Sequence, residues 1–154
     1  MTSAADHWLY RLDAEAWLRA AAAELALGEA LVELRRTAVT HARRAAGMAL
    51  NGVLVAQSEV TGDREAAAVR WGRSYVDHLR AVARDGALDA TKLPPTAARA
   101  AAALLAIAPT GGRDLVQLAT SANGPATRAL ALARELFGAC EAAAHALAGR
   151  EAAP

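Results

Sequence analysis

Four histidines and one cysteine are the side chains of this sequence best suited to metal binding or proton transfer. No two histidines are three or four residues apart, the spacing that places two ligands on one helix face. No glutamate is followed three residues later by histidine, so the di-metal carboxylate motif of helical bundles is absent. The sequence therefore predicts no metal site and no cofactor. The four histidines are His7, His41, His78 and His145, and the cysteine is Cys140.

The glycines form none of the familiar phosphate-binding or nucleophile motifs. Neither GxxxxGK[ST], GxGxxG nor GxSxG occurs in the chain. Cys140 has no second cysteine with which to form a disulfide or a zinc ribbon. The common phosphate-loop, hydrolase and thiol-redox classes thus have no support from motifs.

The composition indicates a single helical domain over residues 1–154, with 55% hydrophobic and 21% charged residues. Of the 17 basic residues only Lys92 is a lysine, which leaves 16 arginines. Since alanine and glycine are also abundant, GC-rich codons explain this excess better than nucleic-acid binding. No apolar run reaches the roughly 18 residues of a membrane span. We therefore expect a cytoplasmic protein without a membrane partner.

The spacing of apolar residues predicts helices along almost the whole chain. In the first helix Asp13 is a good N-cap, and Trp17, Ala20, Leu27, Leu31 and Leu34 form one apolar stripe. In the second helix Gly47 and Gly52 would let a neighbouring helix approach closely. The prediction is an all-α, up-and-down bundle of three or four long helices and two short ones, with an ordered core over about 13–148. The expected helices are 13–34, 37–57, 63–84, 96 to the residue before Pro109, 113–121 and 126–148.

Charge is distributed unevenly along the chain. Residues 1–34 carry two arginines against six acidic residues, and residues 35–84 carry nine arginines against four. These segments therefore have net charges of −4 and +5, while residues 85–154 balance six against six. One interpretation is an RNA-facing surface on the middle helices. The interpretation we favour places the acidic first helix beside the basic second helix, with ion pairs at their rim.

Three segments resemble parts of the HEPN superfamily. Residues 41–54 read HARRAAGMALNGVL, similar to that family's alanine-rich second helix of the AxKALKALL type. Residues 78–82 read HLRAV, similar to its H-x-L-x-x-L stretch, and residues 129–136 read ALALAREL, similar to its closing helix. The order of these segments matches the family across most of residues 13–148. The resemblance implies a helical bundle that dimerises.

The resemblance also implies a candidate chemistry. Many HEPN proteins are metal-independent ribonucleases with an R-x(4–6)-H motif, in which the arginine stabilises phosphate charge and the histidine transfers a proton. Arg73 and His78 have this spacing, and so does the rival pair of Arg36, or Arg35, with His41. Five residues along a continuous helix turn through about 140°. Such a pair could act together only across a dimer interface or where the helix breaks.

A second interpretation assigns the same residues to packing. His78 would then lie with Trp71 and Tyr75 on the buried face of the third helix, and Arg73 would pair with Asp77 at the surface. Asn51 would be a buried amide satisfied by a neighbouring helix. A third interpretation is a small-molecule cavity lined by Trp17, Trp71 and Tyr75. The candidate binding residues are Tyr75, Trp71 and Asn51.

Taken together, the sequence favours a dimerising protein-interaction module without chemistry of its own. The alternative is a toxin-like endoribonuclease that uses Arg73 and His78 across a dimer interface. The expected partners are a second copy, a protein such as a nucleotidyltransferase, and, for the alternative function, RNA.

Overall fold

The computed structural model describes residues 7–65, 74–85, 93–109 and 124–151, and all regular structure in these ranges is helical. This confirms the predicted all-α fold. The expected helix over 113–121 lies outside the described residues. The elements are a short 3-10 helix, η2 (Trp8–Arg11), and the α-helices α1 (Ala14–Ala30), α2 (Arg35–Thr61), α4 (Tyr75–Asp85), α6 (Pro95–Ala106) and α7 (Gly124–Glu151).

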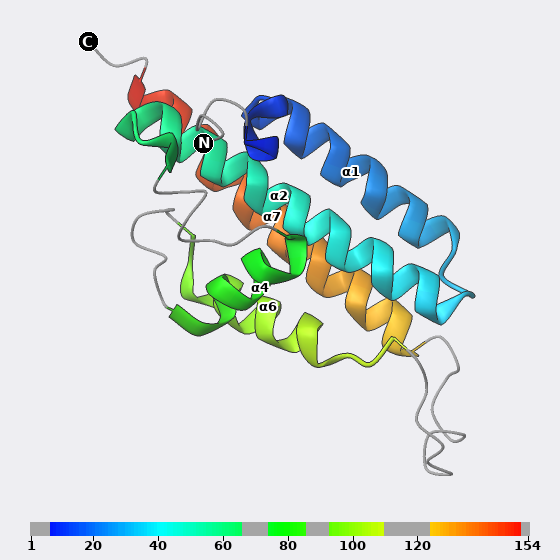
Figure 1. Ribbon diagram of the computed structural model, residues 1–154. Helices are drawn as coiled ribbons and strands as arrows, with labels where there is room; N and C mark the ends of the chain where they lie inside the picture. Colours follow the sequence, from blue (N-terminus) through cyan, green and yellow to red (C-terminus); the bar gives the residue numbers. More distant parts are fainter. Residues whose placement is uncertain (1–6, 66–73, 86–92, 110–123, 152–154) are drawn as a thin grey trace.

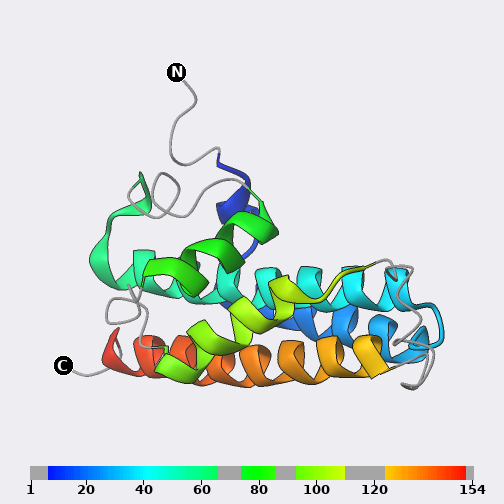
Figure 2. The same cartoon turned by 90° about the horizontal axis from the view of Figure 1, so that it is seen from below.

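The long helix α2 is the centre of the bundle (Figure 1). It packs against both α1 and α7, and these three helices lie side by side. The shorter helices α4 and α6 pack on each other, with α4 against α2 and α6 against α7 (Figure 2). The outer side of α1 is therefore the long helical face farthest from α4 and α6.

The ends of α1 and α2 follow from local signals. The Asp13 carboxylate accepts a hydrogen bond from the Ala16 N–H at 2.7 Å, which confirms the predicted N-cap. The helix ends at Ala30 rather than Leu34, because the chain then turns with a hydrogen bond from the Leu34 N–H to the Leu31 carbonyl. Helix α2 runs past the predicted end to Thr61 and stops at Gly62, whose φ of 72° is left-handed.

The predicted continuous helix over 63–84 is wrong at Ser74. There the Ser74 hydroxyl donates to the Asp77 carboxylate at 2.8 Å and accepts from the Asp77 N–H at 3.2 Å. These bonds satisfy a free N–H of a helix start, so α4 begins anew at Tyr75. Helix α6 begins at Pro95, a residue that favours the first helical position, and not after a Thr96 cap.

The apolar stripe predicted for α1 is only partly buried. The face that packs inward carries Trp17, Leu18, Ala21, Leu25 and Gly28. Leu27 and Leu34 of the predicted stripe remain 49% and 56% exposed. Two apolar stripes lie side by side on α1. Helices α2 and α7 together bury the stripe that contains Leu18 and Leu25.

Glycines provide the close approaches between helices that the sequence predicted. A Cβ built on Gly47 would lie 2.3 Å from the Tyr75 Cβ, and one built on Gly52 would lie 3.1 Å from the Ala14 carbonyl oxygen. Gly47 thus admits the start of α4, and Gly52 admits the start of α1. Gly28, which the sequence did not single out, has the same role against Leu130 of α7.

Candidate functional site

His78 belongs to a buried aromatic cluster. Its side chain is 2% exposed, and its ring stacks on Trp8 with centroids 5.9 Å apart and planes 14° apart. Trp17 and Tyr75 meet the same Trp8 edge to face at 5.9 and 6.0 Å. Trp71 lies outside the described residues. The structure therefore brings together two of the predicted aromatic residues, Tyr75 and Trp17, with His78.

Trp8 is the member of this cluster that sequence reasoning missed. It lies in η2, which is too short to produce a helical period. The only available signal was a dense group of large side chains in the stretch HWLY before the Asp13 cap. Trp17 holds this segment against α1, because its indole N–H donates a hydrogen bond to the Leu9 carbonyl at 2.8 Å.

The environment of His78 opposes a role in proton transfer. Helix α4 begins at Tyr75, so the expected continuous helix is interrupted at Ser74, four residues before His78. Arg73, however, lies outside the described residues. A histidine that transfers a proton must come within hydrogen-bond reach of its substrate. Because Trp8 covers the His78 ring, His78 has the position that the packing interpretation expects.

The rival pair is also not brought together. Arg36 is exposed, and α2 is continuous between Arg36 and His41, so the two side chains leave the helix about 140° apart. The partner of His41 is Glu24 of α1, with Nδ1 and Oε2 2.6 Å apart. The other Glu24 oxygen lies 3.3 Å from Arg44. Glu24 therefore joins α1 to α2 and fixes the orientation of the His41 ring.

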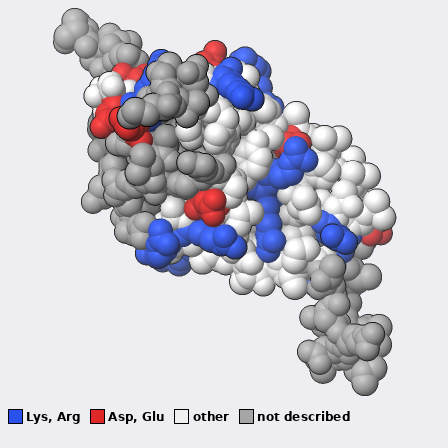
Figure 3. Space-filling model, in the orientation of Figure 1, with Lys and Arg blue, Asp and Glu red and all other residues white. Residues whose placement is uncertain are grey.

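Several arginines of the basic segment 35–84 form ion pairs or hydrogen bonds with other residues of the chain. The Glu24 contacts confirm the predicted ion pairing between the acidic first helix and the basic second helix. Arg35 donates to the Ala108 carbonyl at 3.0 Å, and Arg80 pairs with Asp77 at 3.5 Å. Figure 3 shows the basic groups on this face scattered among uncharged atoms, with acidic groups between them.

Asn51 is a buried amide without a hydrogen-bond partner in the described structure. Its side chain is fully buried, and neither Oδ1 nor Nδ2 has a partner there. The expectation that a neighbouring helix satisfies it is wrong. Asn51 lies one turn after Gly47, so it faces the same side of α2, where α4 packs.

We expect Asn51→Leu to raise the free energy of unfolding by about 1 kcal/mol, because burying an unsatisfied amide is costly. Urea denaturation followed by circular dichroism would measure the change. Ser58→Ala is the matched control, since Ser58 is buried on the same helix but donates to the Val55 carbonyl at 2.8 Å. That variant should lose about 0.5–1 kcal/mol. A loss of stability in Asn51→Leu would mean that the amide has a partner in solution.

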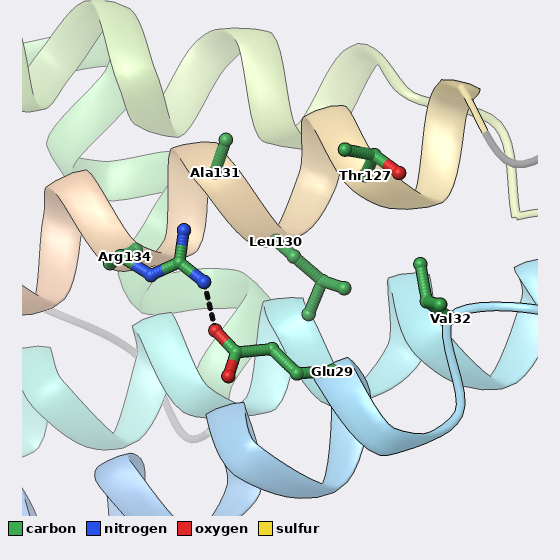
Figure 4. A pocket seen from close by; sticks show the side chains of 6 residues that line it. All are labelled: Glu29, Val32, Thr127, Leu130, Ala131 and Arg134. Atoms are coloured by element: carbon green, nitrogen blue, oxygen red, sulfur yellow. Dashed lines mark hydrogen bonds and ion pairs between the residues drawn. The ribbon is translucent and has the colours of Figure 1, made fainter.

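Trp8 occupies the space between Trp17 and Tyr75, two of the three residues predicted to line an aromatic cavity. Trp17 and Tyr75 approach edge to face at 6.5 Å, and both contact Trp8. The groove drawn in Figure 4 lies elsewhere, between the end of α1 and the start of α7, with a volume of about 220 Å³. Its apolar side chains are those of Val32, Leu130 and Ala131. An ion pair joins Glu29 to Arg134 across it. It contains none of the predicted binding residues.

The remaining observations concern possible metal ligands, the pKa values of buried groups and membrane spans. In the described ranges no three histidine, cysteine or carboxylate side chains gather as metal ligands. Cys140 is fully buried, which raises the pKa of its thiol. Burial also raises the pKa of the Tyr75 phenol, while Arg44 opposes and Glu24 adds to this effect. None of the helices in these ranges has the length and apolarity to cross a bilayer.

The outer side of α1 carries exposed apolar residues. Five residues spaced 4, 3, 4 and 3 apart form what we call the outer seam: Ala16, Ala20, Ala23, Leu27 and Ala30. Leu27 is half exposed, and Leu34, which continues the series beyond the helix end, is 56% exposed. Figure 3 shows the surface along the second half of α1 as largely uncharged.

No protein-family model, curated protein or solved structure matches this chain. The resemblance to the HEPN superfamily therefore stays a prediction that rests on the sequence segments alone.

Proposed function

We propose that this chain is a protein-interaction module that forms a homodimer through the outer seam of α1 and has no chemistry of its own. The observation that carries the proposal is the seam itself, an apolar stripe whose second half, at Ala23, Leu27 and Ala30, is exposed. The second apolar stripe of α1, through Leu18 and Leu25, already packs in the core. One stripe therefore packs in the core, and the second half of the other stripe lies at the surface.

The spacing of the seam suits a second helix. Apolar residues that alternate three and four apart form the contact line of helices packed at a shallow angle. Four of the five seam residues are alanine, so a partner helix can come close along the whole line, with Leu27 as its one large side chain. Burying such a stripe removes apolar surface from water without stranding a polar group.

The test is the oligomeric state in solution. We expect wild-type protein to sediment as a dimer in analytical ultracentrifugation, and Leu27→Glu to raise the dimer dissociation constant at least tenfold, because it buries a carboxylate in an apolar contact. Val60→Glu is the matched control. Val60 is a 42% exposed apolar residue near the far end of α2, and its replacement should leave the dimer unchanged.

Two results would overturn the proposal. One is wild-type protein that stays monomeric up to high micromolar concentration. The other is a dimer that Leu27→Glu and Val60→Glu weaken equally, which would place the contact away from the seam. Circular dichroism of both variants would show whether a loss of dimer is accompanied by a loss of fold.

A further inference from the structure

We infer that the groove between the end of α1 and the start of α7 binds a small zwitterion, a free α-amino acid with an apolar side chain of about the size of leucine (Figure 4). None of the residues that line this groove belongs to the outer seam. Binding in the groove therefore does not depend on the proposed homodimer.

The groove is charged at one end and apolar along the rest of its length. Glu29 and Arg134 form an ion pair at one end, and Leu130 and Val32 follow toward the other end (Figure 4). Leu130 is only 4% exposed, so packing holds it in place as an apolar wall. The charged end suits a polar head group, and the apolar part suits a hydrocarbon side chain.

The ion pair leaves hydrogen-bonding capacity at both of its partners. It joins Nη2 of Arg134 to Oε1 of Glu29, and within the described ranges neither side chain has another ion pair or hydrogen bond. A guanidinium has five N–H donors and a carboxylate has two acceptor oxygens, so each group can take a second partner of opposite charge. Both side chains are more than one third exposed, so a ligand can reach them.

A zwitterion is the ligand whose charges match this pair. If it lies beside the pair in the reverse direction, its carboxylate meets Arg134 and its ammonium meets Glu29, so that four charges alternate in sign. A carboxylate without an ammonium would also lie close to the Glu29 carboxylate, and an amine without a carboxylate would lie close to Arg134. The two charges of the groove sum to zero, which favours a ligand with zero net charge.

The size of the groove limits the side chain of the ligand. Its volume of about 220 Å³ equals that of about seven water molecules, at about 30 Å³ each. This is less than the roughly 300–1,000 Å³ of sites for drug-sized ligands. Leu130 lies four residues before Arg134, which is about 6 Å along α7. A side chain of three or four carbon atoms, attached to a head group at Arg134, therefore contacts Leu130 and loses apolar surface to water there.

Titration of the isotope-labelled protein with L-leucine, followed by NMR, tests the inference. We expect saturable shifts of the backbone amides of residues 29–32 and 127–134, with a dissociation constant of about 1 mM. Three compounds each lack one part of leucine: isocaproate has no ammonium, isoamylamine has no carboxylate, and glycine has no apolar side chain. Each should bind about tenfold more weakly than leucine.

Variants of the ion pair test the charged end of the groove. We expect Glu29→Gln and Arg134→Gln each to weaken leucine binding about fivefold to tenfold, because each removes one of the four alternating charges. Arg128→Gln is the matched control, since Arg128 is an exposed arginine of α7 outside the groove. This variant should leave the dissociation constant of leucine unchanged. The same spectra show that the variants stay folded, as expected when an exposed ion pair is lost.

An absence of saturable shifts up to about 20 mM leucine would refute the inference. Shifts confined to residues other than 29–32 and 127–134 would also refute it, because leucine would then bind outside the groove. Equal binding of leucine and isocaproate would show that the ammonium has no partner, which rules out the zwitterion. Leu27→Glu, which we expect to dissociate the homodimer, should still bind leucine, so the two proposals stand or fall separately.

Discussion

Replacing Gly47 with alanine is expected to lower the free energy of unfolding by about 2 kcal/mol. The new Cβ would lie 2.3 Å from the Tyr75 Cβ and 2.8 Å from the Tyr75 Cα. Real Cβ atoms do not come this close, and the obstacle includes backbone, so rotating the tyrosine ring does not relieve it. The first turn of α4 would have to move away from α2, which would loosen the contact of Tyr75 with Trp8 and Trp17. The roughly 1 kcal/mol that alanine gains over glycine in a helix offsets only part of this cost.

Gly138→Ala is the control for this prediction. Gly138 is also a helical glycine, in α7, but a Cβ at this position meets no atom within 4 Å. That variant should therefore gain about 0.5–1 kcal/mol from helix propensity. Thermal denaturation should move Tm down by about 4–8 °C for Gly47→Ala and up for Gly138→Ala. Equal shifts in the two variants would mean that α4 does not pack on Gly47 in solution.

The regular parts of the fold could be predicted because their causes are local. The aspartate at position 13 caps the backbone three residues away, and Gly62 ends α2 because it adopts a left-handed conformation that most other residues disfavour. The close approaches at Gly47 and Gly52 were also readable, since glycines inside a long apolar helix need a packing reason. These signals depend on neighbours within a few residues.

The choice between the two stripes of α1 depends on partners that are distant in sequence. Periodicity showed that α1 is apolar over a wide arc, but both stripes fit a helix equally well. The residues that decide between them are Gly28 and Leu130, which meet where α1 crosses α7, more than 100 residues apart in the sequence. The same limit explains why Leu27, which the sequence placed on an apolar stripe, is half exposed.

The candidate site shows a related limit of motif spacing. Arg73 and His78, and equally Arg36 and His41, fit a spacing that says nothing about exposure. His78 is buried because a tryptophan from the N-terminal segment stacks on it, and His41 faces Glu24 because α1 and α2 form a hairpin. Asn51 shows the opposite error, since the described structure supplies no partner for its amide.

Arg43→Ala is expected to lower the free energy of unfolding by about 3 kcal/mol. One guanidinium nitrogen of Arg43 donates to the Leu105 carbonyl at 3.0 Å and to the Ile107 carbonyl at 2.7 Å. Both carbonyls belong to the end of α6, where the last turn of a helix has no internal donors. Removing the arginine leaves these carbonyls without a charged partner and breaks the link between α2 and the end of α6. Desolvation, and secondarily Arg80, lower the pKa of Arg43, as expected for a guanidinium held in the structure rather than in solvent.

Two further variants show whether the charge or the geometry is responsible. Arg43→Lys keeps the charge but offers a compact ammonium in place of the planar fork, so we expect a loss of about half as much. Arg36→Ala removes an exposed arginine from the same helix and should change stability by less than about 0.5 kcal/mol. Urea denaturation of the three variants measures the differences. If Arg43 instead served a surface for nucleic acid, Arg43→Ala would match Arg36→Ala in stability. The difference in the free energy of unfolding between Arg43→Ala and Arg36→Ala therefore tells whether Arg43 stabilises the bundle or is available to bind a polyanion.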